Sequence, residues 1–124
     1  MYNDTILNNF KTTKHAGRIL KTDAVGESGS AATGILFKFS MEIENNFDIQ
    51  DAKFQVYGCP VAIATASAMC AFLIGKNIKN VLDTKEEEIF AELKIPPNKQ
   101  NYQTLAKQAT DLAILNFLKK LKNQ

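Results

Sequence analysis

The sequence predicts an α+β fold: a three-stranded antiparallel sheet with helices packed on one face. Three observations support this prediction. Apolar and polar residues alternate between residues 35 and 56, helical spacing of apolar residues takes over from residue 60, and the predicted strands precede the helices. That order is typical of a sheet with helices segregated to one side. The 124 residues favour a single domain spanning residues 1–124.

The first elements of the chain are predicted to be a helix and a loop. Residues 2–13 have the pattern of a short polar helix in which Ile6 and Phe10, four positions apart, face the core. Residues 22–34 are rich in glycine, serine, alanine and threonine, which is typical of a mobile loop. The segment between them, residues 18–21, is the candidate for the third strand.

Two strands follow and are predicted to form an antiparallel hairpin. In residues 35–44 the odd positions are apolar and the even positions mostly polar, as expected of a strand with one buried face. A turn near residues 45–46 leads to a second alternating run, in which Ala52, Phe54 and Val56 share one side.

Three helices complete the predicted fold. The first covers residues 60–74 and ends near Gly75, a residue type that commonly closes helices. The second is a short acidic helix at residues 85–93, which the following proline pair ends. The last runs from about residue 101 to 121. Its apolar residues recur at three- and four-residue steps, at Leu105, Ala109, Leu112, Leu115 and Leu118.

Composition and charge exclude several classes of function. Fifteen Lys and Arg against 13 Asp and Glu leave a net charge of +2, which gives no electrostatic case for a nucleic acid or a membrane surface as the main partner. The longest apolar run, residues 60–74, is shorter than the roughly 20 residues that cross a bilayer. No secretory signal, disulfide framework, catalytic triad or phosphate-binding glycine loop is recognisable. We therefore expect a cytoplasmic protein that is not an enzyme.

Cys59 is the candidate reactive group. Pro60 is the residue type preferred at the first helical position, so Cys59 is expected at the N-cap, where free backbone N–H groups and the helix dipole favour a thiolate. Gly58 removes side-chain bulk next to the sulfur. A thiolate attacks electrophiles and binds metals. The alternative is a buried cysteine that serves as a small apolar side chain, and the local sequence leaves both interpretations open.

Cys70 and His15 are not expected to join this site. On a rigid helix Cys70 would lie on the order of 16 Å from Cys59, at about 1.5 Å per residue, which is too far for a shared metal or a disulfide. Its neighbours are apolar, so Cys70 is predicted to fill the core. His15 is the single histidine and is predicted to be a solvated surface residue.

The run DAKFQVYGC at residues 51–59, followed by AIA at residues 62–64, resembles the IscU/NifU N-terminal family of iron–sulfur cluster scaffold proteins. The resemblance continues through residues 91–99 into residues 105–106 and covers nearly the whole chain. It implies the α+β architecture that IscU- and SufE-type proteins share, and it implies a role in iron–sulfur cluster assembly.

Most of the family's cluster ligands are replaced in this chain. The family usually carries three cysteines and an aspartate, with a histidine beside the last cysteine. Its Cys-Gly-Asp segment corresponds here to Thr33-Gly34-Ile35 and its His-Cys pair to Asn101-Tyr102, so only Cys59 remains at a ligand position. A cluster or a zinc ion needs about four ligands. The resemblance therefore implies iron or a transient, weakly bound cluster as cargo, and no tight zinc site in the monomer.

Two partner segments of the family are altered as well. The family's Leu-Pro-Pro-Val-Lys segment, which a DnaK-type chaperone reads, corresponds to Ile95-Pro96-Pro97-Asn98-Lys99. Its prolines favour an extended backbone, and the alternative is a simple helix breaker. The family's Asn-Pro-Arg-Asn-x-Gly segment corresponds to residues 11–17, which bears on the docking of a cysteine desulfurase. A monomer or a weak homodimer is expected.

Three functions remain open from the sequence. A scaffold-type protein would handle iron or sulfur through Cys59 without holding a cluster alone. A persulfide carrier would accept sulfur on Cys59, which requires only one accessible thiolate. A ligand-depleted relative would act only as a protein-interaction module, with an exposed Tyr102 beside Thr33 and Ile35 as its contact surface.

Overall fold

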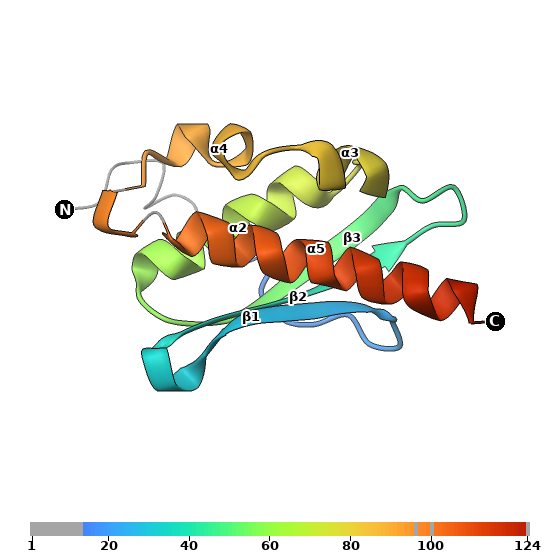
Figure 1. The fold of residues 1–124 in the computed structure, drawn as a ribbon, viewed down its shortest axis with the longest axis horizontal. Helices are drawn as coiled ribbons and strands as arrows, with labels where there is room; N and C mark the ends of the chain where they lie inside the picture. The colour runs from blue at the N-terminus through green and yellow to red at the C-terminus, as the bar shows by residue number, and fades with distance from the viewer. Residues whose placement is uncertain (1–13, 96, 100, 124) are drawn as a thin grey trace.

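The structure, a computed structural model, describes residues 14–95, 97–99 and 101–123. The helix predicted for residues 2–13 lies outside these residues. Within them the chain forms a three-stranded antiparallel sheet with helices on one face, which confirms the predicted fold class (Figure 1). Among the described residues, no helix combines the length and the apolar character that a membrane span requires.

The sheet has the strand order β1-β2-β3, with β1 at Ala24–Ser30, β2 at Ile35–Ile43 and β3 at Ile49–Tyr57. The predicted hairpin is confirmed, because β2 and β3 pair antiparallel with Leu36 opposite Tyr57. The register of this pair brings the beginning of β2 and the end of β3 to the same end of the sheet.

The loop predicted for residues 22–34 is wrong, because most of that segment is strand β1. Gly26 supplies the physical reason. Helix α5 (Asn101–Lys122) crosses this strand so closely that a Cβ at position 26 would overlap backbone atoms of Ala109 and Ala113. The small residues here are positions of close backbone approach, not signs of mobility.

The third strand predicted for residues 18–21 is also wrong. This segment runs as irregular chain, held by the N–H of Ile19, which donates to Ser40 Oγ at 2.8 Å. The connection from β1 to β2 is a short 3-10 turn, η1 (Ala31–Thr33), followed by Gly34 at a φ of +82°. That backbone conformation favours glycine, which explains the residue type at this position.

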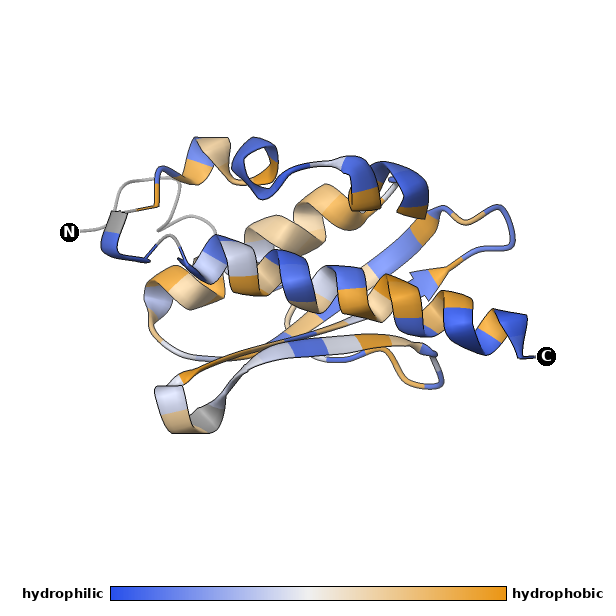
Figure 2. Ribbon diagram, in the orientation of Figure 1, coloured by the Kyte–Doolittle hydropathy of each residue, from blue (hydrophilic) through white to orange (hydrophobic). Residues whose placement is uncertain are grey.

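Helix α2 (Pro60–Leu73) begins at the predicted residue and ends one residue earlier than expected. Cys59 is its N-cap, Pro60 is its first residue, and Gly75 follows it at a φ of +89°. The helix packs against β3 and is apolar on nearly every side, as its pale and orange colouring in Figure 2 shows. It is therefore a core helix that carries Cys59 at one end.

The predicted C-terminal helix is confirmed as α5, which packs across β1 and β2 and lies beside α2 (Figure 1). The recurring leucines do not all lie on its core side. Leu105 and Leu118 are partly buried and pack against the core, whereas Leu112 and Leu115 are 41% and 53% exposed. The close approach at Gly26 leaves room mainly for small side chains under the helix. The fully buried residues of α5 are accordingly Ala106, Ala109, Thr110, Ala113 and Ile114.

The connection between α2 and α5 contains more structure than the sequence predicts. Helix α3 (Ile78–Asp83) was not predicted; Asn77 caps it by accepting the N–H of Lys79 at 3.1 Å. The acidic helix predicted for residues 85–93 is divided into α4 (Glu86–Ile89) and a 3-10 turn, η2 (Ala91–Leu93). Phe90 lies between them and is only 1% exposed, so its ring joins the core at the break.

Candidate functional site

Cys59 lies where strand β3 passes into helix α2, at the end of the sheet that also holds η1. Gly58 joins the two elements, and a Cβ added there would lie 3.0 Å from the Ala62 Cβ, which is tighter than ordinary contact. The N-cap prediction for Cys59 is confirmed, with Pro60 as the first helical residue. The Cys59 side chain is half-buried. Its sulfur is therefore positioned by the backbone and remains accessible in part.

Two side chains from the C-terminal half of the chain approach this sulfur. The Tyr102 hydroxyl oxygen lies 3.5 Å from Cys59 Sγ, and the Lys99 Nζ lies 3.6 Å from it. Tyr102 belongs to the first turn of α5, whereas Lys99 ends the short 3-10 turn η3 (Pro97–Lys99). We refer to Cys59, Lys99 and Tyr102 as the thiolate cluster.

The thiolate cluster is held against the core through Tyr102. The Tyr102 ring meets the Phe37 ring edge to face at a centroid distance of 6.3 Å. The Lys99 Nζ lies 5.6 Å from the centroid of the Tyr102 ring, within the range of a cation–π contact. The phenol therefore has little freedom, and its hydroxyl stays directed at the sulfur.

The electrostatics of the cluster favour an ionised sulfur. Partial burial is the largest single influence and raises the pKa of Cys59, but the opposing influences together exceed it. These are the Tyr102 hydroxyl, the backbone N–H groups of Ala62 and Val61, and the Lys99 ammonium, which leave the pKa of Cys59 below its ordinary value. The two N–H groups act without forming a capping hydrogen bond.

Tyr102 shifts in the opposite direction. Its hydrogen bond with Cys59 is the main cause that raises the pKa of Tyr102, followed by burial. Cys59 therefore loses its proton before Tyr102 does. In the ionised form of the cluster, the phenol hydroxyl donates and the sulfur accepts. This arrangement favours the interpretation of Cys59 as a reactive thiolate over that of an inert core cysteine.

Tyr102 is not the exposed contact residue that the sequence suggested. Its side chain is only 6% exposed, because the hydroxyl points at Cys59 and the ring packs on Phe37. The prediction of an interaction surface built around an exposed Tyr102 is therefore wrong. Asn101, the other residue at the family's His-Cys position, is exposed at the start of α5.

The Thr33-Gly34-Ile35 segment lies at the same end of the sheet, but the side chains of Thr33 and Ile35 make their contacts elsewhere. The Gly34 carbonyl oxygen would lie 3.6 Å from a Cβ placed on Gly58, so the segment is adjacent to the β3–α2 junction. The hydroxyl of Thr33 donates to the Ser30 carbonyl at 2.9 Å within its own turn. The Ile35 side chain is half-buried and packs on the core.

The proline segment at residues 95–99 has two interpretations from the sequence, an extended backbone and a helix breaker. The extended backbone is wrong for residues 97–99, which form the 3-10 turn η3. The alternative, a helix breaker, agrees with the interruption between η2 and α5. Ile95 is 4% exposed, whereas Asn98 is exposed. The turn directs Lys99 to Cys59. This role has no local signal in the sequence, since the contact joins residues 40 positions apart.

Cys70 and His15 have different outcomes. Cys70 is fully buried in α2, as predicted, and burial strongly raises the pKa of its thiol. The prediction of a solvated His15 is wrong, because its side chain is 9% exposed. The reason is that residues 15–17 line the free edge of β3, where the Phe54 N–H donates to the His15 carbonyl at 2.9 Å.

The donor atoms at the site do not fit a resident iron–sulfur cluster or zinc ion. Among the residues that the structure describes, no three His, Cys, Asp or Glu side chains converge on a point where a metal could bind. The thiolate cluster offers one sulfur, one phenol and one ammonium, and an ammonium has no lone pair to donate. What the cluster can do chemically is stabilise one thiolate and a negative charge next to it.

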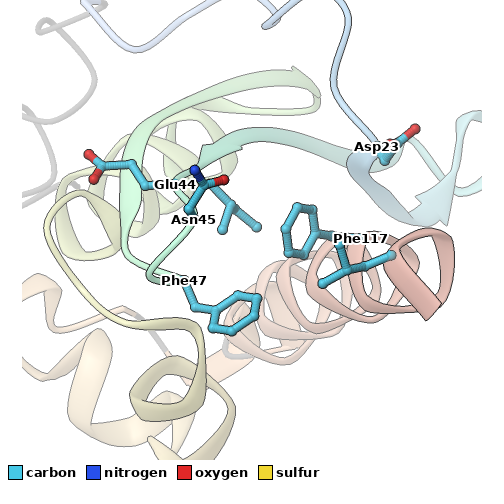
Figure 3. Close-up of a pocket in the computed structure, with 7 residues that line it drawn as sticks. Asp23, Glu44, Asn45, Phe47 and Phe117 are labelled. Carbon is cyan, nitrogen blue, oxygen red and sulfur yellow. The ribbon is translucent and has the colours of Figure 1, made fainter. Parts of the chain in front are cut away.

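A second concave region lies at the opposite end of the β2–β3 hairpin. It has a volume of about 300 Å³ and is lined mainly by the apolar side chains of Ile43, Phe47, Phe117 and Leu121. Figure 3 shows the carboxylates of Asp23 and Glu44 directed away from the two phenylalanine rings. This cavity therefore lacks a set of converging polar groups, and the thiolate cluster is the better candidate for chemistry.

The fold and the site define a class: a small α+β domain with a thiolate-favouring cysteine at the start of a core helix. The family described as "NifU-like N terminal domain" matches residues 1–124. The chain therefore belongs to the family of NifU-like N-terminal domains, as its sequence suggested.

Relatives of similar length agree with this assignment. The chain is 30% identical to "Iron-sulfur cluster assembly scaffold protein IscU" of Haemophilus influenzae, over 94% of both chains. It is 32% identical to "Iron sulfur cluster assembly protein 1" of Encephalitozoon cuniculi, over 98% of this chain and 89% of that protein.

A solved structure shares the fold. It is a putative scaffold protein for the SUF system from Fervidobacterium islandicum AW-1, with a TM-score of 0.72 and 21% identity over 91% of this chain and 96% of that chain.

Proposed function

We propose that this protein acts as a scaffold-type protein in iron–sulfur cluster assembly and handles sulfur or iron through Cys59, without holding a cluster alone. The observation that carries the proposal is the thiolate cluster: Cys59 Sγ lies at a helix N-terminus with the Tyr102 hydroxyl at 3.5 Å and the Lys99 ammonium at 3.6 Å. Membership of the NifU-like N-terminal family and relatives named as cluster scaffolds support the process.

The ligand count limits what one chain can hold. A cluster requires about four ligands, mostly thiolates. This site provides one thiolate, and two chains that met at Cys59 would provide two. Iron or a cluster would therefore be transient cargo, completed by groups from a partner. The protein would have no catalytic turnover of its own.

A persulfide carrier is the second candidate, and the single stabilised thiolate favours it. Sulfur transfer by exchange needs one nucleophilic sulfur and one donor persulfide, with no further ligand. Cys59 meets that requirement, since its pKa is lowered and its side chain is partly exposed. In this role the chain would carry sulfur to a site elsewhere.

Two kinds of partner follow from the proposal. A cysteine desulfurase would supply sulfur, and its donor sulfur must reach the half-buried Cys59. A DnaK-type chaperone would read residues 95–99. Because Ile95 is 4% exposed, such a chaperone would need this segment to open locally before the isoleucine could be bound.

One paired experiment tests the proposal. The protein is incubated anaerobically with a cysteine desulfurase and cysteine, and its intact mass is measured. A second sample is incubated with ferrous iron and sulfide, and its visible absorbance is recorded. We expect the gain of sulfur in the wild type and in Cys70→Ala, its loss in Cys59→Ser, and no stable cluster absorbance in any of them.

Two results would contradict the proposal. Sulfur on Cys59 in none of the samples, together with no iron bound, would leave only the role of a protein-interaction module. A stable, fully protein-coordinated cluster in the isolated wild type would show that one chain supplies enough ligands after all.

A further inference from the structure

Among the described residues, the polar groups that act on the Cys59 sulfur favour negative charge on it. The ammonium of Lys99 lies 3.6 Å from the sulfur, and the positive end of helix α2 faces the same atom. The Tyr102 hydroxyl adds a hydrogen-bond donor at 3.5 Å. Within the part of the chain that the structure describes, Lys99 is the charged side chain that acts on the Cys59 sulfur. All these groups stabilise negative charge, and none of them compensates a positive one.

We infer that Lys99 and Tyr102 make the Cys59 site selective for an anionic sulfur atom over a divalent metal ion. The cargo of the site is then the outer sulfur of a persulfide, and Lys99 is the positioning residue that selects it. This inference rests on the proposed function and narrows it from sulfur or iron to sulfur.

The loading step is a thiol–disulfide type of exchange. The Cys59 thiolate attacks the outer sulfur of a donor persulfide, R–S–SH, and a new S–S bond forms at Sγ. The S–S bond of the donor breaks, and its electron pair leaves with the inner sulfur as the thiolate R–S⁻. The product is Cys59–S–SH, with no net oxidation or reduction. Persulfides are more acidic than thiols, so the bound outer sulfur carries negative charge at neutral pH.

Lys99 can follow the charge as it moves outward. An S–S bond is about 2.05 Å long, so the outer sulfur stays within reach of a lysine side chain that already contacts Sγ. Charge-assisted hydrogen bonds are about twice as strong as neutral ones. The Tyr102 hydroxyl continues to donate to the inner sulfur, Sγ, and holds that atom at the N-terminus of α2.

The same positive groups repel a divalent metal ion. Zinc bound to a thiolate lies about 2.3 Å from the sulfur. The ammonium of Lys99 would then face a second cation at close range, with only one thiolate between them. The site therefore opposes metal binding beyond its mere shortage of ligands. Repulsion by Lys99 predicts that removing this lysine strengthens metal binding, whereas a simple lack of ligands predicts no change.

The test measures sulfur loading and zinc binding on the same variants. The fraction of Cys59 that carries sulfur is read by intact mass at equilibrium with glutathione persulfide and glutathione at neutral pH. Zinc affinity is measured by competition with a chromophoric chelator. The variants are Lys99→Gln, Lys99→Arg, Tyr102→Phe and Cys59→Ser, and thermal unfolding confirms that each is folded.

We expect Lys99→Gln to lower the equilibrium constant for sulfur loading about tenfold and to bind zinc more tightly than the wild type. Lys99→Arg should keep loading within about threefold, since it retains the charge. Tyr102→Phe should change loading by less than about threefold, because the hydroxyl donates to Sγ both before and after the outer sulfur is added. Cys59→Ser should load no sulfur.

The outcomes separate the inference from the proposed function. If the wild type loads sulfur and Lys99→Gln loads it equally well, selection by Lys99 is wrong while sulfur handling by Cys59 stands. If Lys99→Gln loses sulfur and zinc together, Lys99 has only a structural role and the inference is again wrong. If neither the wild type nor Lys99→Arg takes up sulfur, the sulfur-handling part of the proposed function fails as well.

Discussion

Cys59 and Cys70 belong to the same helical segment, yet their surroundings are opposite. Cys59 caps the helix, is half-buried, and has a hydroxyl and an ammonium within 3.6 Å, so its pKa is lowered. Cys70, eleven residues later, is fully buried among apolar side chains, and burial strongly raises its pKa. One residue type thus serves as a reactive group at the helix end and as core filler within it. What differs is the access to water and to charge.

The largest expected contrast between the two cysteines is in their reactivity. In the native protein, iodoacetamide should alkylate Cys59 about 1,000-fold faster than Cys70, because Cys70 reacts only when the helix opens. Peptide mapping by mass spectrometry, before and after unfolding in urea, measures both rates. Comparable rates for the two thiols under native conditions would remove the basis of the contrast.

Stability should show the reverse contrast. Cys70→Ser introduces a hydroxyl into an apolar site and should lower the free energy of unfolding by about 1–3 kcal/mol. Cys59→Ser, at a half-buried position, should change it by less than about 0.5 kcal/mol. Urea denaturation measures both values, with Cys70→Ala as the control for loss of volume alone. A greater loss in Cys59→Ser than in Cys70→Ser would reverse our assignment of roles.

A pH profile sharpens the origin of the difference. The alkylation rate of Cys59 follows its thiolate fraction, so it rises with pH and levels off above the pKa. Because the pKa of Cys59 is lowered, the plateau should come at a lower pH than for free cysteine. Lys99→Gln removes a positive charge and should shift the curve to higher pH, with a rate about two- to fivefold lower at pH 7. An unchanged curve would mean that the Lys99 charge does not reach the sulfur.

The smallest expected effect is the pH dependence of stability that comes from the partly buried His15 side chain. Burial, and then Lys14 and Lys53, lower the pKa of His15, whereas Asp51 raises it. The unfolded chain therefore binds this proton more readily than the folded one. As the pH falls below about 6.5, the ordinary value for histidine, the folded state loses stability.

The variant His15→Gln isolates this contribution. Between pH 7 and pH 5 the wild type should lose up to about 1 kcal/mol more stability than His15→Gln, as measured by urea denaturation at each pH. Carboxylates and other groups titrate equally in both proteins and cancel. Parallel losses would show that the His15 side chain is effectively solvated.

The sequence predicted the elements that depend on local pattern. The strand at Ile35–Ile43, the helix at Pro60–Leu73 and the N-cap at Cys59 follow from alternation, helical spacing and proline preference. Strand β1, which it missed, depends on partners distant in the chain. Strand β1 has no apolar alternation because α5 covers it at Gly26 and excludes side chains there.

The candidate site shows the same division. Cys59 was identified from its neighbours in sequence, whereas its contacts were not. Tyr102 lies 43 residues from Cys59, and its 6% exposure follows from how α5 begins beside the sulfur. In the sequence, Lys99 stands out only as the last residue of a partner segment. A 3-10 turn sets its direction, which composition does not reveal.

Gly26 lies under the middle of α5 and has a consequence for the chemistry at the N-terminal end of that helix. Because no methyl group separates strand from helix there, α5 rests at the lowest height above the sheet that its backbone permits. Tyr102 is carried by that same helix. Any bulkier residue at position 26 would push α5 away from the sheet at that point. If the helix tilted as a result, the Tyr102 hydroxyl would move away from the Cys59 sulfur. The meeting of two side chains thus depends on a third position that has none.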